Sequence, residues 1–149
     1  MELPPLAWSV SLKEDKLYIL DETKLPEEEV YIIAPTYLEA AQAITDMKTR
    51  AFGQVLTLFY AFLLTARHNR GEKGEVILSR LRKVGWTLEN ARPTFAFKDL
   101  TKQVLRWAEQ AEAEGKDISS YLETNILGFL DNLRMLRLKR AGYASSLLE

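Results

Sequence analysis

Two arginines stand where helices are expected to begin, and both could bind a phosphate group. Arg50 lies at the junction of the first two expected helices, and Arg92 lies in the segment 90–94, ahead of a later helix. Free backbone amides and the positive end of the helix dipole favour an anion at such positions, and a guanidinium offers phosphate a fork of donors. From spacing alone, a structural salt bridge is the favoured explanation of each arginine, and phosphate binding is the alternative.

The composition excludes most other chemistry. The chain of 149 residues has no cysteine, which rules out a disulfide framework, a thiolate nucleophile and a thiolate metal site. Its single histidine, His68, excludes a multi-histidine metal centre, and a capping or solvated role is expected for it. The 20 basic and 21 acidic residues give a net charge of −1, so neither nucleic acid nor an anionic membrane is an expected partner. No catalytic residue, metal or cofactor is expected.

We expect neither a secretion signal nor a membrane span. The N-terminus lacks a basic region followed by a long apolar one, as a signal peptide would have. The apolar stretch 55–66 is shorter than the roughly 20 residues that a spanning helix needs, and Thr57 and Thr65 interrupt it. The chain is therefore expected to be cytoplasmic and to form a single compact unit.

The chain changes its periodicity once, and this change predicts a mainly α fold. In residues 1–35, short runs alternate between apolar and polar residues or are rich in strand-forming residues, which predicts a small antiparallel β-meander of three strands. Residues 36–149 follow a helical period, which predicts a bundle of four or five helices. Thr36 and Glu39 have the spacing of a capping box at the start of the first helix. The residues expected on its buried face are Tyr37, Ala40, Ala41, Ile44 and Met47.

The later helices are expected at about 52–68, 75–88, from 97 to Gly115, and from Ile118 onward. The second is apolar nearly all round, which is typical of a central helix packed on several sides. Asn90 or Thr94 is expected to cap the helix that begins near 97. Most of the three tryptophans (Trp8, Trp86 and Trp107) are expected in the core. The basic run at the end of the last helix (Arg134, Arg137, Lys139 and Arg140) is expected to complement the negative end of the helix dipole.

Two segments together resemble a known family. The first segment is similar to the "LLDQ…LPEEEVY…M…RGAPAIG" segment of methylthioribose-1-phosphate isomerases, and it consists of the run KLYILDETKLPEEEVY leading to Met47-Lys48-Thr49-Arg50. The second segment is Ala91-Arg92-Pro93-Thr94, which is similar to the "ARPTAVN" segment of these enzymes. These isomerases belong to a superfamily with translation initiation factor 2B. The resemblance covers nearly the whole chain and is clearest at 16–50 and 91–94.

The resemblance implies a helical N-terminal domain that precedes, in full-length isomerases, a Rossmann-like domain with the catalytic cysteine and aspartate. It also implies that the two motifs hold the substrate phosphate, and the matching residues here are Arg50, Ala51, Gly53, Arg92, Pro93 and Thr94. The first motif departs from the isomerase pattern and is nearer to the "RGAGRIA" variant of ribose-1,5-bisphosphate isomerases. Phe52 is expected to obstruct backbone approach to a ligand.

Three functions follow as expectations. The first is a stand-alone, non-catalytic homologue of this N-terminal domain that forms a homo-oligomer or binds a partner resembling the Rossmann-like domain. Association is favoured by apolar residues near the C-terminus, namely Leu136, Leu138, Tyr143, Leu147 and Leu148. The alternative is a sugar-phosphate-binding subunit, or a degenerate isomerase, that uses Arg50 and Arg92. The third is a role related to translation initiation.

Overall fold

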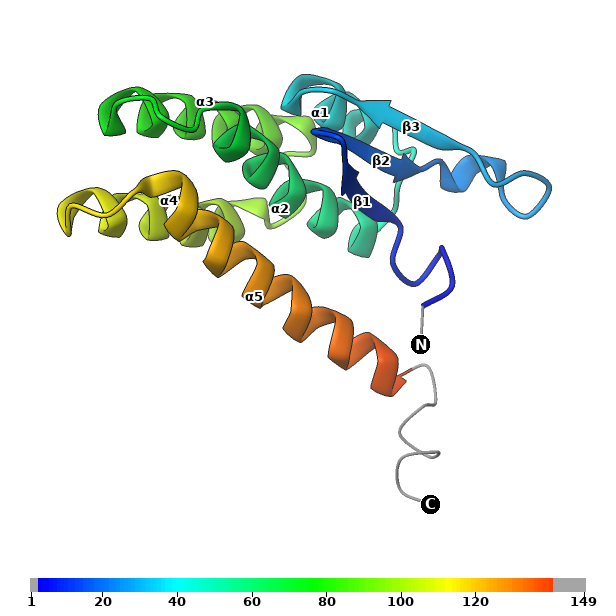
Figure 1. Cartoon of the computed structure of the whole chain (residues 1–149). Coiled ribbons are helices and arrows are strands. Elements are labelled where there is room, and N and C mark those ends of the chain that lie inside the picture. The colour runs from blue at the N-terminus through cyan, green and yellow to red at the C-terminus, as the bar shows by residue number, and fades with distance from the viewer. Residues whose placement is uncertain (1–2, 141–149) are drawn as a thin grey trace, which may run out of the picture.

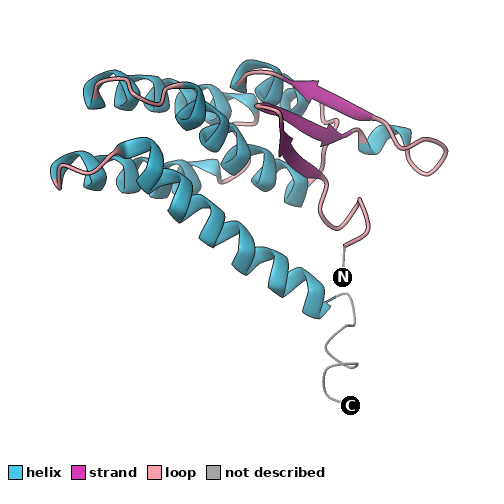
Figure 2. Ribbon diagram, in the orientation of Figure 1, coloured by secondary structure: helices cyan, strands magenta, loops and turns pink. Residues whose placement is uncertain are grey.

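A computed structural model of the chain describes residues 3–140, and it is a mainly helical structure with a small sheet at its N-terminal end (Figures 1 and 2). The elements are β1 (Val10–Lys13), β2 (Lys16–Leu20), a 3-10 turn (Glu22–Lys24), β3 (Tyr31–Ala34), α1 (Tyr37–Thr45), α2 (Ala51–His68), α3 (Gly74–Ala91), α4 (Phe97–Ala113) and α5 (Ile118–Leu138). The predicted fold class is confirmed. Within residues 3–140, no helix combines the length and the apolar character needed to cross a membrane.

The sheet is an antiparallel meander in the order β1-β2-β3. Glu14 and Asp15 have φ values of 52° and 59°, so both central residues of the β1–β2 turn are left-handed, as a tight type I′ hairpin requires. In the register, Val10 lies opposite Ile19 and Ile19 lies opposite Ile32. These side chains face the helices and belong to the same hydrophobic core as the helical residues.

Helix α1 has the predicted capping box and ends in a Schellman motif. The Thr36 side chain accepts from Leu38 N at 3.1 Å, and Glu39 Oε1 accepts from Thr36 N at 2.8 Å. At the other end, Met47 N donates to Ile44 O and Lys48 N donates to Ala43 O. Met47 has a φ of 54° there and is 47% exposed. The expectation that Met47 continues the buried face of α1 was therefore wrong, because the helix stops at Thr45.

Helix α2 is the central element, as its all-round apolar sequence predicted. It is buried from Leu56 to Ala66 and contacts the four other helices as well as β1 and β2. Phe59 and Phe62 are among its fully buried side chains. Its buried threonines are satisfied within the helix, since the Thr57 hydroxyl donates to Gly53 O at 2.7 Å.

The connection from α3 to α4 corrects one expectation. Helix α3 runs on to Ala91, so Asn90 lies in its last turn and donates to Trp86 O at 2.8 Å. Thr94 lies in the exposed turn that follows, and the N-cap of α4 is Ala96, which makes no side-chain capping bond. The capping role expected for Asn90 or Thr94 was therefore wrong.

Helix α5 carries the chain back to its N-terminal segment (Figure 1). Arg137 Nε donates to Ala7 O at 3.4 Å, and the Arg137 guanidinium carbon lies 4.0 Å from the centre of the Phe52 ring. The Arg134 guanidinium carbon lies 4.6 Å from the centre of the Trp8 ring. Two residues of the basic run thus stack on aromatic rings of distant segments, and the expected interaction of the run with the helix dipole stays a prediction.

Candidate functional site

Arg50 is the N-cap residue of α2, where its own backbone amide already has a partner. The residue is extended, its side chain is exposed, and its N–H donates to Glu22 Oε2 at 2.8 Å. The hydroxyl of Thr49 donates to the same oxygen at 3.0 Å. Glu22 comes from the 3-10 turn after β2, so this turn supplies a carboxylate to the positive end of α2.

Gly53 is required by the close packing at this end of α2. A Cβ at Gly53 would lie 2.8 Å from Ser9 Oγ and 3.1 Å from Glu22 Oε2, and closer still to Thr49 Oγ1. The hydroxyl of Ser9 is buried and has no hydrogen-bond partner among the described residues. The residue before β1, the 3-10 turn and α2 therefore meet at Gly53 without room for a side chain.

Arg92 lies at the C-cap of α3, and not directly before a helix as expected, since α4 begins only at Phe97. Its guanidinium is half-buried and donates from Nη1 to Gln54 Oε1 at 2.7 Å. The Arg92 guanidinium carbon also lies 5.0 Å from the centre of the Phe95 ring. These contacts direct Arg92 toward the first turn of α2.

Gln54 joins the two arginine segments. It is fully buried, and its Nε2 donates to Thr49 O at 2.8 Å while its Oε1 accepts from Arg92. One side-chain amide thus bridges the residue before Arg50 to the guanidinium of Arg92. The structure brings the two segments together at the N-terminus of α2.

The charges of the two arginines are not neutralised by ion pairs among residues 3–140. The six ion pairs of this part of the chain involve other cations, and neither Arg50 nor Arg92 takes part in one. The structural salt bridges considered from the sequence are therefore not what holds these side chains. Arg92 is held instead by a neutral amide and an aromatic ring, which leave its positive charge available to an anion.

A nearby carboxylate, Asp21, is already engaged with other groups. Burial raises the pKa of Asp21, but the hydrogen bonds from Thr23 and the charges of Lys48 and Lys24 outweigh it, so the pKa is lowered. Lys48 Nζ lies 4.0 Å from Asp21 Oδ2. Glu22 is thus the carboxylate that faces the start of α2 directly.

Phe52 points to another side of α2. Its ring packs edge-on against Trp8, with 6.0 Å between the ring centres, and beneath Arg137. Residues two apart on a helix point about 200° apart, so the ring of Phe52 and the amide of Gln54 lie on different faces. Phe52 therefore fills the side that faces Trp8 and leaves the Arg92 side open. Ala51, in the first turn, is exposed.

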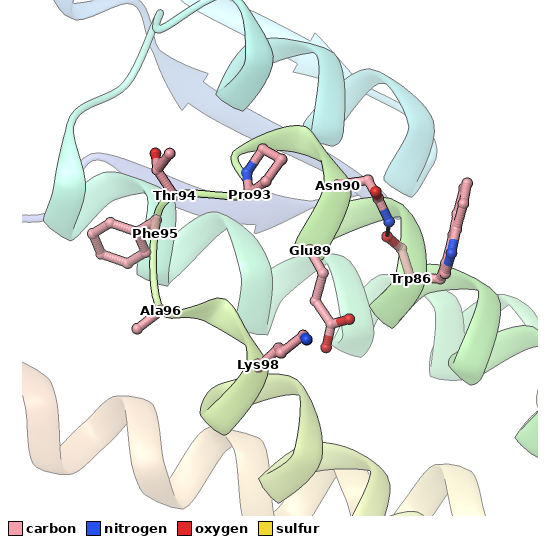
Figure 3. Close-up of a pocket in the computed structure, with 8 residues that line it drawn as sticks. All are labelled: Trp86, Glu89, Asn90, Pro93, Thr94, Phe95, Ala96 and Lys98. Carbon is pink, nitrogen blue, oxygen red and sulfur yellow. Dashed lines mark hydrogen bonds between the residues drawn. The ribbon is translucent and has the colours of Figure 1, made fainter.

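Pro93 and Thr94 line an open groove on the surface of the α3–α4 connection (Figure 3). The groove has a volume of about 700 Å³. Its lining residues are Trp86, Glu89, Asn90, Pro93, Thr94, Phe95, Ala96 and Lys98. The expectation that tryptophans lie in the core was wrong for Trp86, which is 67% exposed. Trp8 and Trp107 are half-buried. Among residues 3–140, no group of three or more acidic or histidine side chains could hold a metal ion.

Sequence reasoning missed two residues that organise this site, Glu22 and Gln54. Gln54 did carry a signal, because a polar amide in a helix that is apolar all round must find partners inside the protein. Glu22 carried none, since it lies 28 positions from the amide that it binds.

The sequence is similar to part of several methylthioribose-1-phosphate isomerases. It is 38% identical to the enzyme of Desulforudis audaxviator over 97 residues, which are 63% of this chain and 26% of that enzyme. It is 37% identical to the enzyme of Aquifex aeolicus over 123 residues, which are 79% of this chain and 23% of that enzyme. The chain thus spans about a quarter of the length of these two relatives. No protein-family model matches it.

Two solved structures share the fold. One is the 5-methylthioribose 1-phosphate isomerase of Pyrococcus horikoshii, with a TM-score of 0.69 and 21% identity over 89% of this chain and 40% of that one. The other is subunit delta of the translation initiation factor eIF-2B from A. fulgidus, with a TM-score of 0.66 and 23% identity over 84% of this chain and 36% of that one. The chain is therefore a homologue of the N-terminal region of methylthioribose-1-phosphate isomerases, and it shares the fold of that region with initiation factor 2B.

Proposed function

We propose that this chain is a non-catalytic binding module that holds the phosphate group of a sugar phosphate through Arg92 and Arg50. The supporting observation is the position of the Arg92 guanidinium, which Gln54 fixes beside the N-terminus of α2 and which forms no ion pair with a carboxylate among residues 3–140. The relatives are named for a phosphorylated sugar, methylthioribose 1-phosphate. The proposal assigns no isomerisation to this chain, because the chain has no cysteine to act as the thiol that the family resemblance implies.

In this proposal, the two arginines have different tasks. Arg92 is half-buried and pre-oriented, so it contributes a directed, charge-assisted hydrogen bond to a phosphate oxygen. Arg50 is exposed and contributes charge from the start of α2. Gly53 permits the packing that positions this start, and Ala51, Pro93 and Thr94 form the adjoining surface. Glu22 bonds the Arg50 amide, so the guanidinium groups rather than that amide hold the anion.

Calorimetric titration with methylthioribose 1-phosphate tests this function. Arg92→Ala should keep the fold and lower the affinity by about 1.5–3 kcal/mol, which is the magnitude of a lost charge-assisted hydrogen bond. Arg106→Ala removes the same charge from an exposed position on α4 and serves as the matched control. Absence of binding to the wild-type chain at millimolar ligand, or an equal loss in both variants, would refute the proposal.

A second candidate function is partner binding at the groove beside Arg92. Trp86 is 67% exposed there, and an exposed tryptophan beside a groove is typical of an interaction surface. The partner would be a second copy of the chain or a protein resembling a Rossmann-like domain. Leu136 is 51% exposed and Leu138 is half-buried, while Tyr143, Leu147 and Leu148 lie outside the described residues.

Light scattering tests the self-associating form of this candidate. The chain should have a mass above the 17.1 kDa of one copy at micromolar concentration, and Trp86→Ser should shift it toward that mass. A wild-type chain that stays at the mass of one copy would refute self-association. The cytoplasmic location and the role related to translation stay predictions.

A further inference from the structure

A second cavity lies at the opposite end of α2 from Arg50. Its volume is about 300 Å³, and it is formed where the C-terminus of α2 meets the start of α1 and the middle of α3. The residues that matter for its chemistry are Thr36, Tyr37, His68, Asn69, Arg80 and Lys83. Since α2 has 18 residues, the two ends of the helix are about 27 Å apart. This cavity is therefore separate from the Arg50 and Arg92 site.

The cavity concentrates positive charge. Two cationic side chains, Arg80 and Lys83, lie along its α3 wall together with His68 from α2, and no carboxylate is among its lining residues. None of these three side chains takes part in an ion pair among residues 3–140. The Glu39 carboxylate accepts hydrogen bonds from Thr36 in the capping box, which lower its pKa, so it keeps its negative charge beside the Thr36 edge of the cavity.

A buried amide positions one of the cations. Asn69 is 5% exposed, and its Oδ1 accepts a hydrogen bond from the Arg80 guanidinium while its Nδ2 donates to Thr65 O at 2.7 Å. A guanidinium carries five N–H donors, so Arg80 keeps donors for a ligand after this bond is made. The contact fixes the Arg80 side chain before any ligand arrives, which lowers the entropy that binding costs.

The two helix ends at the cavity act on an anion in opposite directions. The positive end of α1 begins at Thr36, on the cavity wall, where the Glu39 carboxylate already caps it, and the negative end of α2 lies at His68 and Asn69. At the C-terminus of α2, the carbonyl oxygens of Thr65 and Ala66 already accept hydrogen bonds from Asn69 and Ser119. These bonds satisfy two carbonyl groups but do not remove the negative end of the α2 dipole, so the attraction for an anion comes from the side chains of Arg80 and Lys83.

We propose that this cavity binds a phosphate-class oxyanion, either free phosphate or a small phosphate monoester, through Arg80 and Lys83. Tyr37 and His68 complete the wall, and Nε2 of the His68 ring lies 3.3 Å from Asp15 O. A volume of about 300 Å³ suits a phosphate group with a few water molecules, and it is at the lower limit of ligand pockets. The proposal does not depend on the function assigned to Arg92.

Titration of the full chain with inorganic phosphate, followed by NMR of the His68 ring and the Arg80 guanidinium, tests the proposal. We expect saturable shifts of both groups at millimolar phosphate or below. Lys83→Gln, an exposed substitution, should raise the dissociation constant about tenfold, the equivalent of one charge-assisted hydrogen bond. Arg82→Gln removes the same charge from the neighbouring position, where Arg82 pairs with Glu109 at 3.2 Å, and should change the constant less than about twofold.

The variants distinguish this site from the other. In Arg92→Ala the shifts of His68 and Arg80 should persist unchanged, because Arg92 lies toward the opposite end of α2. Repeating the titration with ribose 5-phosphate identifies the source of the anion, and tighter binding than inorganic phosphate would assign the site to a monoester. Absence of saturable shifts, equal losses in the Lys83 and Arg82 variants, or loss of the shifts in Arg92→Ala would each overturn the proposal.

Discussion

Replacing Gly53 by alanine should destabilise the protein, although alanine is the better helix former. A methyl group at this position meets Ser9 Oγ at 2.8 Å and Glu22 Oε2 at 3.1 Å, and it overlaps Thr49 Oγ1. Thr49 must therefore move, and the hydrogen bond from its hydroxyl to Glu22 must break or lengthen. Because Glu22 also binds the Arg50 amide, the change reaches the start of α2.

Three contributions determine how much Gly53→Ala changes the free energy of unfolding. The helix propensity of alanine over glycine contributes about 1 kcal/mol in favour of the variant. Overpacking costs about 1–3 kcal/mol, and losing a hydrogen bond to a charged group costs about 1.5–3 kcal/mol when no replacement forms. The net loss in the free energy of unfolding is then about 3 kcal/mol, within a range of about 1.5–5 kcal/mol. For a chain of 149 residues a loss of about 3 kcal/mol lowers the melting temperature by about 6–12 °C.

Urea denaturation of the two proteins measures this loss, with Gly128→Ala as the matched control. Gly128 is exposed inside α5, and a Cβ there meets no atom within 4 Å. Gly128→Ala should therefore gain about 0.5–1 kcal/mol from helix propensity alone. If Gly53→Ala were as stable as the wild type or more stable, the close packing inferred at the start of α2 would be wrong.

Two further predictions concern α5. Burial raises the pKa of Glu123, but the hydrogen bonds and charges of Arg67 and Arg70 outweigh burial and lower this pKa below the usual 4.5. The ionised Glu123 therefore stabilises the folded protein above pH 4.5, and this stabilisation is lost as the pH falls through the folded-state pKa. Glu123→Gln should therefore be less stable than the wild type by about 1–2 kcal/mol at pH 7, a range that counts the exposed pair with Arg70 as weak because solvent screens it. This difference in stability should shrink toward pH 3. A difference that does not change with pH in urea titrations would contradict the assignment. Arg137→Ala should lower the free energy of unfolding by about 1 kcal/mol, because the contact with Phe52 is lost, and an unchanged urea midpoint would count against this contact.

The fold could be predicted because its helices carry their own boundary and burial signals. Thr36 and Glu39 have the spacing that the capping box requires, and the all-round apolar sequence of α2 predicted its central position. Met47 is a residue for which the helical period gave a wrong prediction. It continues the apolar period of α1, yet it adopts a left-handed conformation that methionine does not signal.

The site could be predicted less completely, because its contacts join segments that are far apart in the chain. Arg50 and Arg92 were identified from local motifs, but the bond between Arg92 and Gln54 spans 38 positions. The exposure of Trp86 was open to prediction, since it lies two positions beyond the buried Val84 and so on the opposite face of α3. The stacking of Arg134 and Arg137 on distant rings depends on tertiary packing that no local pattern encodes.

The return of α5 to Ala7 has a consequence for the order in which the protein can fold during its synthesis. A ribosome adds roughly 5–20 residues per second, so Trp8 and Phe52 leave the ribosome on the order of ten seconds before Arg137. The β-meander and α1 can form early from neighbouring segments. The rings of Trp8 and Phe52 can contact Arg134 and Arg137 only after α5 has been synthesised. The contact that joins residues 130 positions apart can therefore form only after α5 has left the ribosome. Until α5 docks, the nascent chain presents these two rings to the surrounding cell.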